Sequence, residues 1–153
     1  MSDLKDKVAI VTGASAGIGA AIVQKLLESG MKVVGLARRK AKVEELEKGY
    51  EGKLFAKETD VTKEEDIIDA FKWTEKNVGP VYVLVNNAGV AYVSSIDEAD
   101  AEKLSVAGHY PAGISGLSIY TASKHGVTAF TESIRRELAE SGNKIRITSL
   151  SPA

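Results

Sequence analysis

Two side chains in the later part of the sequence could exchange a proton with a substrate. Tyr120 and Lys124 are four residues apart in a stretch with helical periodicity, so both would lie on one face of a helix. An ammonium group beside a phenol favours the phenolate and lowers its pKa. The pair could therefore act as a general acid or base near neutral pH, although an isolated pair of this kind is more often a plain surface feature.

A glycine-rich segment near the amino terminus could hold phosphate. The segment Thr12-Gly13-Ala14-Ser15-Ala16-Gly17-Ile18-Gly19 follows a short apolar run and precedes an amphipathic stretch. Glycines let the backbone approach a pyrophosphate, and the amino terminus of the following helix attracts negative charge. Gly13 could instead simply end a strand, and Gly17 and Gly19 could simply permit close helix packing. The position between strand and helix favours phosphate binding.

The basic run Arg38-Arg39-Lys40 follows a second apolar strand. An acidic residue at this point would bind the ribose hydroxyls of NAD(H), whereas arginine accommodates the 2′-phosphate of NADP(H). The run could also be a solvated charged surface. Cations near a helix amino terminus are disfavoured, however, and a bound phosphate would offset that cost. Arg38 and Arg39 therefore predict NADP(H).

The elements that must position these residues alternate along the first half of the chain. Apolar runs without alternation predict buried parallel strands, and spacings of three and four predict helices. The expected strands are 8–11, 32–37, 53–56 and 81–85, and the expected helices are 18–27, 43–48 and 63–77, the last capped by Thr62. This alternation predicts a doubly wound parallel α/β sheet.

The second half is less regular. Glycines and prolines punctuate it before a long expected helix over 118–140 and a last expected strand over 144–150. With 153 residues, the chain is expected to form one domain, residues 1–153.

Composition excludes several classes of function. A formal net charge of −1 gives no overall field that would attract nucleic acid or an anionic membrane. The absence of cysteine excludes thiolate catalysis and disulfides, and His109 and His125 lack the spacing of metal ligands. We find no targeting segment and no apolar run long enough to span a membrane, so a cytoplasmic protein is expected.

Together these motifs resemble the short-chain dehydrogenase/reductase family. Four elements occur in the family's order, and four are far more specific than one. They are the glycine segment Thr12 to Gly19, the pair Asp60-Val61, the segment Asn86-Asn87-Ala88-Gly89, and Tyr120-Thr121-Ala122-Ser123-Lys124.

The resemblance implies a role for each residue. Tyr120 would be the acid that protonates a carbonyl oxygen, or the base in the reverse direction, and Lys124 would hold the nicotinamide ribose. Ser105 best matches the serine that orients the substrate carbonyl, with Ser115 and Ser118 as competitors. The expected cofactor contacts are Gly13, Ser15, Ala16, Gly17, Ile18, Gly19, Arg38, Arg39, Asp60, Val61, Asn87, Ala88, Gly89, Tyr120, Lys124 and Pro152.

The chain departs from the family pattern in one interior region. Only 15 residues separate Gly89 from Ser105, too few for the family's next helix and its fifth strand. The resemblance therefore covers residues 4–103 and 105–152 with a gap between them, and the family's last strand and substrate lid would follow Pro152.

The family interconverts alcohols and carbonyl compounds and forms homo-oligomers through a helix missing here. The motifs look most like those of cytosolic animal reductases with small lipophilic substrates; a shortened form that binds nucleotide or a partner without turnover is the alternative.

Overall fold

The computed structural model describes residues 4–89, 118–142 and 145–149. The chain divides into two compact units, Met1–Ala88 and Gly89–Ala153. Among the helices within the described ranges, none has the length and apolar character required to cross a membrane.

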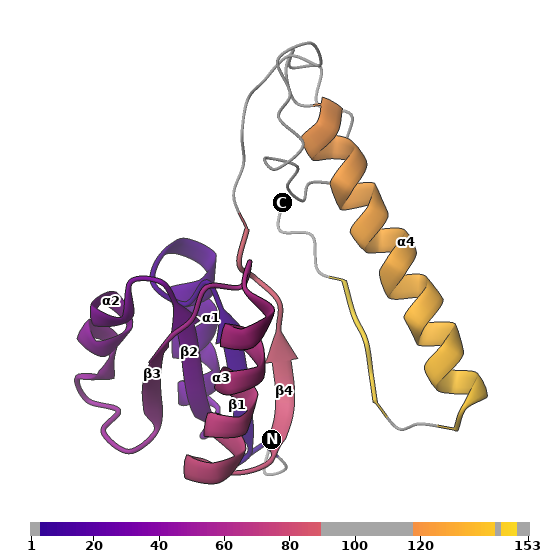
Figure 1. The fold of residues 1–153 in the computed structure, drawn as a ribbon. Helices are drawn as coiled ribbons and strands as arrows, with labels where there is room; N and C mark the ends of the chain where they lie inside the picture. Colours follow the sequence, from indigo (N-terminus) through magenta and orange to yellow (C-terminus); the bar gives the residue numbers. More distant parts are fainter. Residues whose placement is uncertain (1–3, 90–117, 143–144, 150–153) are drawn as a thin grey trace. The chain divides into compact units, whose positions relative to one another are not determined.

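The first unit contains a parallel sheet of four strands (Figure 1). The strands are β1 (Val8–Thr12), β2 (Lys32–Ala37), β3 (Leu54–Glu58) and β4 (Val81–Val85), in the spatial order β3-β2-β1-β4. All three pairings are parallel, and β1 lies between β2 and β4. Every residue of β1 is buried, as its uninterrupted apolar run predicts for a central parallel strand.

Helices cover both faces of this sheet (Figure 1). They are α1 (Gly17–Glu28), α2 (Lys40–Glu44), the 3-10 turn η1 (Glu45–Glu47) and α3 (Glu64–Asn77). Alternate side chains of β1 divide between the two layers: Ala9 and Val11 pack with α1 and α2, whereas Val8 and Ile10 pack on the α3 side. The predicted doubly wound α/β fold is confirmed.

A glycine, Gly35, lies in the middle of β2 between valine and leucine. A Cβ added to Gly35 would lie 2.6 Å from Val43 of α2 and 3.1 Å from Ala14 of the glycine segment. Because no side chain fits that gap, Gly35 allows α2 and the glycine segment to pack closely on the strand.

Two details of the expected helices are wrong. The helix expected over 43–48 begins earlier, at Lys40, and tightens into the 3-10 turn after Glu44. Thr62 does not cap α3: the residue before the helix is Lys63, which has no side-chain cap hydrogen bond. The Thr62 hydroxyl instead donates to Asp60, 2.8 Å away, so a local turn takes the group that the cap would have used.

The described part of the second unit consists of one long helix and one extended segment. Helix α4 (Ser118–Glu140) has the predicted bounds. Residues 145–149 carry no strand, so the strand expected over 144–150 is wrong for the described residues. A strand exists only through its neighbours' hydrogen bonds, and the described residues of this unit contain no strand to pair with it. The guanidinium of Arg135 donates to the Ile147 carbonyl instead, at 3.2 Å.

Candidate nucleotide-binding site

The glycine segment joins β1 to α1 at the carboxyl edge of the sheet. Gly13 and Gly17 have φ angles of +67° and +55°, in the left-handed region that favours glycine. A Cβ on Gly19 would lie 2.2 Å from the carbonyl oxygen of Gly13 and 2.5 Å from the side-chain nitrogen of Asn87. Here the backbone of α1 passes so close to the segment that only glycine fits.

The first turn of α1 has no side chain to satisfy its N–H groups. Its cap residue Ala16 is extended, makes no side-chain cap hydrogen bond, and the turn contains no acidic residue. The backbone donors and the positive end of the helix dipole are thus open to an external anion. Gly17, Ile18 and Gly19 begin this helix, so the predicted contacts lie where a phosphate would bind.

Hydrogen bonds connect the glycine segment to the end of β4. The Thr12 hydroxyl accepts from the backbone N–H groups of Asn87 at 3.0 Å and Ala88 at 2.9 Å, and donates to the Val85 carbonyl at 3.4 Å. In return, the Asn87 side chain donates to the carbonyls of Thr12 at 3.0 Å and Gly13 at 3.4 Å. Asn87 therefore braces the two strand ends, and Gly89, two residues later, is exposed.

The basic pair lies at the end of β2. The Arg39 guanidinium donates to the Ser15 hydroxyl at 3.4 Å, which brings a cation to the glycine segment. Arg38 is exposed, and its charge acts on Asp60 after β3. The pKa of Asp60 lies below its ordinary value, first because the backbone N–H of Thr62 donates to the carboxylate, then because the Thr62 hydroxyl does so. The ends of β2 and β3 thus place charged groups at one edge of the sheet.

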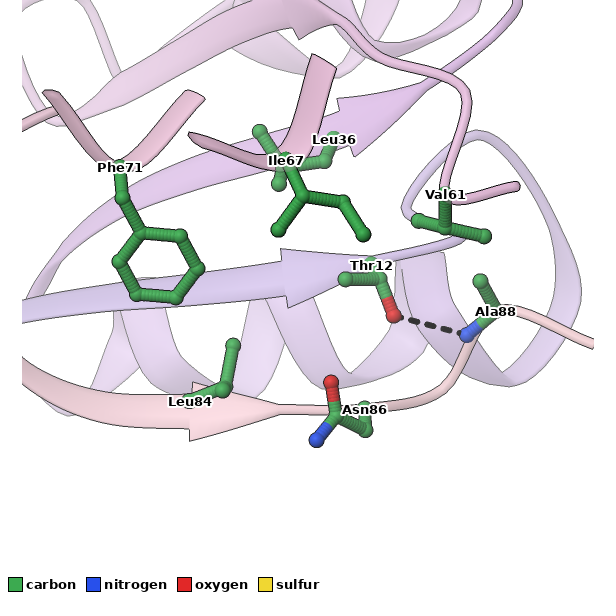
Figure 2. Close-up of a pocket in the computed structure, with 8 residues that line it drawn as sticks. All are labelled: Thr12, Leu36, Val61, Ile67, Phe71, Leu84, Asn86 and Ala88. Atoms are coloured by element: carbon green, nitrogen blue, oxygen red, sulfur yellow. Dashed lines mark hydrogen bonds between the residues drawn. The ribbon is translucent and has the colours of Figure 1, made fainter. Parts of the chain in front are cut away.

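A cavity of about 300 Å³ opens beside this edge, on the face that α3 covers (Figure 2). Ile67 and Phe71 of α3 lie across it from Leu84 of β4 (Figure 2). The cavity is mostly apolar, and its lining residues are Thr12, Leu36, Val61, Ile67, Phe71, Leu84, Asn86 and Ala88. Of the predicted cofactor contacts, Val61 and Ala88 lie in this wall, so the cavity adjoins the edge that carries the glycine segment.

The predicted catalytic residues belong to the other unit. Tyr120 and Lys124 are one turn apart on α4, as their spacing predicts. Partial burial lowers the pKa of Lys124 from its ordinary value. Ser105 and Pro152 lie outside the described residues, as do the competitor Ser115 and His109. The structure therefore brings together the predicted residues of the first unit and leaves the catalytic set a prediction.

Sequence reasoning missed part of this site. The motif alone marks Thr12 only as the residue before the glycines, although a hydroxyl at the end of a fully buried strand needs hydrogen-bond partners. A periodic pattern identifies an inward-facing residue but does not show whether a cavity adjoins it. It therefore places four cavity residues only in strands or a helix: Leu36, Ile67, Phe71 and Leu84.

The fold and this edge define a Rossmann-like α/β protein with a glycine-rich turn between its first strand and first helix. The family model for short chain dehydrogenase matches residues 7–106 and 103–153. The chain belongs to the short-chain dehydrogenase family, whose members include the oxidoreductases below.

Relatives and solved structures agree with this assignment. Farnesol dehydrogenase of Aedes aegypti is 42% identical over 186 residues, covering 95% of this chain and 76% of the relative. Human dehydrogenase/reductase SDR family member 11 is 33% identical over 193 residues, covering 99% and 74%. The crystal structure of 3-ketoacyl-(acyl-carrier-protein) reductase from Brucella melitensis complexed with NADH matches with a TM-score of 0.82 and 25% identity, covering 95% of this chain and 74% of that one.

The same matches confirm the interior shortening. The match to the Aedes aegypti protein extends over 186 positions, whereas this chain has 153 residues, so positions of the relative lack a counterpart here. The two segments of the family match meet at residues 103–106, next to the gap expected after Lys103.

Proposed function

We propose that this protein is an NADP(H)-dependent oxidoreductase that interconverts an alcohol with a ketone or aldehyde. The observation that carries the proposal is the uncapped first turn of α1, approached by the glycine segment and by the Arg39 guanidinium. Such a turn binds phosphate through backbone N–H groups and the helix dipole. Family membership supports the oxidoreductase class.

The chain's residues fit a dinucleotide. A Cβ at Gly19 would fill the space in which the backbone of the glycine segment meets α1, so glycine at this position allows the close turn that a pyrophosphate would need. The backbone around Gly13, Ser15 and Ala16 would hold the pyrophosphate. Asp60, Val61, Asn87, Ala88 and Gly89 are the proposed adenosine and ribose contacts, and Pro152 is a further one.

Arg38 and Arg39 are proposed to select NADP(H) over NAD(H). Guanidinium groups bind phosphate in a planar, two-pronged geometry. An acidic residue at the end of β2 would instead bind the ribose hydroxyls, and this sequence has arginine there. The hydrogen bond between Arg39 and Ser15 holds one cation beside the phosphate-binding turn. The bound nucleotide would supply or accept a hydride.

Tyr120, Lys124 and Ser105 are proposed to handle the proton. Tyr120 would donate a proton to the carbonyl oxygen during reduction and remove it during oxidation. Lys124, whose lowered pKa reflects partial burial, would favour the phenolate and hold the nucleotide ribose. Ser105 would orient the carbonyl. A small lipophilic alcohol or carbonyl compound is the proposed substrate, and the name of the Aedes aegypti relative makes farnesol a suitable probe.

The interior shortening favours a second candidate, a form that holds nucleotide without turnover. Catalysis needs the reacting groups placed within about 1 Å, since a larger error costs on the order of a hundredfold in rate. Residues between the nucleotide site and Tyr120 are fewer here than in the relatives, so the position of Tyr120 relative to the nucleotide would change.

We also propose that the chain works as one domain of residues 1–153 in the cytoplasm, with a small-molecule partner and no nucleic acid. The balanced charge, with 20 basic and 21 acidic residues, supports the last point. Family-type oligomers would be altered, because the interface helix has no counterpart in the sequence.

One experiment separates the two candidates. NADPH binding is measured by fluorescence, and NADPH oxidation is followed with ketones, aldehydes and farnesal, using Tyr120→Phe as the control. If the chain is an active enzyme, it should both bind and oxidise NADPH. Tyr120→Phe should then abolish NADPH oxidation and leave NADPH binding intact. Binding without turnover leaves the second candidate, and no binding rejects both.

The nucleotide preference has its own test. Arg39→Ala is expected to weaken NADPH about tenfold or more, ~1.4 kcal/mol, and to leave NADH unchanged. Arg136→Ala, which removes an exposed arginine from α4, is the matched control and should change neither. Tighter binding of NADH than NADPH by the unmodified chain would contradict the role of Arg38 and Arg39.

A further inference from the structure

The turn between β3 and α3 is built around Asp60. The backbone N–H of Asp60 donates to the Asp66 carboxylate at 2.9 Å, and its backbone carbonyl accepts from the Lys63 N–H at 3.0 Å. Its own carboxylate accepts from the backbone N–H and the hydroxyl of Thr62. Asp60 is therefore bonded through both backbone groups and through its side chain, and the chain leaves β3 in one tight turn over residues 60–63.

Asp66 supplies a bond that the described sheet does not. The N–H of Thr59 donates to the Ala37 carbonyl at 3.2 Å, so Thr59 still pairs with the end of β2. Because consecutive N–H groups of a strand point to opposite sides, the N–H of Asp60 is directed away from β2. No described strand lies on that side of β3, which is an outer strand of the described sheet. The Asp66 carboxylate accepts this N–H instead.

The same bond joins the turn to a helix with a fixed position. The bonds from Lys63 and Thr62 lie within the turn itself, whereas Asp66 belongs to the first helical turn of α3. Ala70, one helical turn later, is fully buried and packs with residues of β1 and β2. Helix α3 is therefore held on the sheet, and Asp66 transfers that position to Asp60.

Two of the proposed adenosine contacts, Asp60 and Val61, are consecutive residues of this turn. Val61 lines the apolar cavity, and the charge of Arg38 acts on Asp60. Movement of the turn would therefore displace both contacts. A turn that is ordered before the nucleotide arrives adds no ordering cost to binding, whereas a loose turn does.

We propose that Asp66 is a positioning residue for the adenosine end of the bound nucleotide, an inference that rests on the proposed NADP(H) function. Its carboxylate acts through the Asp60 backbone and not on the nucleotide itself. An ionised acceptor makes a stronger hydrogen bond than a neutral one, and the amino terminus of α3 favours negative charge at this position.

The affinity of the full chain for adenosine 2′,5′-bisphosphate, measured by calorimetry, tests the proposal. Asp66→Ala removes the acceptor and should weaken binding about tenfold. Asp66→Asn keeps an oxygen that can accept the Asp60 N–H, so it should restore most of the affinity. Asp66→Leu, which has about the size of asparagine but no acceptor, replaces Asp66→Ala if that variant does not fold by circular dichroism.

Glu65→Ala is the matched control. Glu65 is an exposed carboxylate of the same first turn of α3, so its removal takes away the same charge near the helix amino terminus but leaves the bond between Asp66 and Asp60. It should leave the affinity for adenosine 2′,5′-bisphosphate unchanged. Equal losses in Glu65→Ala and Asp66→Ala would assign the effect to helix charge and overturn the positioning role.

Amide hydrogen exchange tests the structural step without nucleotide. The Asp60 amide should exchange faster in Asp66→Ala than in the unmodified chain or in Asp66→Asn, because its acceptor is lost. The Val33 amide, which donates to the Lys53 carbonyl at 2.7 Å, should keep its rate and reports that the sheet is intact. An unchanged Asp60 rate in Asp66→Ala would contradict the proposal.

The outcomes separate this inference from the proposed function. If the unmodified chain binds neither NADPH nor adenosine 2′,5′-bisphosphate, the NADP(H) function fails and the role of Asp66 fails with it. If the chain binds both and Asp66→Ala binds them equally well, only the role of Asp66 fails. A loss in Asp66→Asn as large as that in Asp66→Ala would also overturn it, because the acceptor is still present there.

Discussion

The two units of this chain differ in how their functional residues are held. In Met1–Ala88, the residues expected to bind nucleotide lie at the ends of neighbouring strands, and hydrogen bonds between Thr12 and Asn87 fasten two of those ends together. In Gly89–Ala153, the described residues form α4 and a segment without a strand. The proposed phosphate contacts are thus held by a sheet, and the proposed proton transfer depends on residues of one helix.

This difference shows which function depends on distant parts of the sequence. The turn proposed to bind phosphate is built from β1, α1 and the strands beside β1, all within the first unit. Tyr120 and Lys124 need only helical periodicity to share a face of α4, but catalysis also requires a fixed position relative to the nucleotide. An interior shortening after the first unit can therefore leave binding intact while changing turnover.

Gly19→Ala should give the largest effect, a loss of NADPH affinity in the first unit. The added Cβ would lie 2.2 Å from the Gly13 carbonyl oxygen, so α1 and the glycine segment must separate. NADPH affinity should fall on the order of a hundredfold, about 2.7 kcal/mol. Titration of NADPH fluorescence measures the loss.

Gly126→Ala is the matched control in the second unit. Nothing lies within 4 Å of a Cβ at Gly126, and this residue is inside α4. Alanine there should leave NADPH binding unchanged and stabilise the helix by ~0.5–1 kcal/mol. If both alanine variants bind NADPH as the unmodified chain does, the close approach at Gly19 is not what forms the site.

Sequence reasoning predicted the first unit well because its signals are local. The buried runs of β1 and β2 differ from the spacing of α1, and the glycine segment marks the turn between them. The hydrogen bonds of the Thr12 hydroxyl were not predicted, because they join residues 73 to 76 positions apart.

The failures elsewhere have the same physical cause. Ile145 and Ile147 alternate with polar residues as in a strand, yet a strand also needs a neighbour that the local pattern does not contain. Thr62 has the residue type of a helix cap, but a turn with Asp60 uses its hydroxyl. Local propensity identified the residue types, and tertiary partners decided their use.

Thr12→Val should give the next largest effect, on stability. Thr12 is 8% exposed, and its hydroxyl accepts from two backbone N–H groups, which the variant leaves without that partner. The free energy of unfolding should fall by about 1–3 kcal/mol. Urea denaturation followed by circular dichroism measures it.

Thr131→Val is the control for Thr12→Val. The Thr131 hydroxyl donates to the Val127 carbonyl within α4, which remains bonded in the helix without it. A change within about 0.5 kcal/mol is expected. Equal losses in both variants would mean that the strand-end hydrogen bonds are no more important than a helical side-chain bond.

Thr62→Ala should give the smallest effect, and it tests which hydrogen bond lowers the pKa of Asp60. The Thr62 backbone N–H is the main cause of the lowered pKa of Asp60 and persists in the variant, while the hydroxyl, the second cause, is removed. The pKa of Asp60 should therefore rise part of the way toward its ordinary value, as an NMR titration of the carboxylate would report.

Because the folded-state pKa is lowered, the ionised carboxylate stabilises the fold above the unfolded-state pKa, and that contribution disappears as the pH falls through the folded-state value. Thr62→Ala should thus lose less stability than the unmodified chain on acidification below about pH 4. An unchanged titration would show that the backbone N–H alone sets the charge of Asp60 beside Arg38.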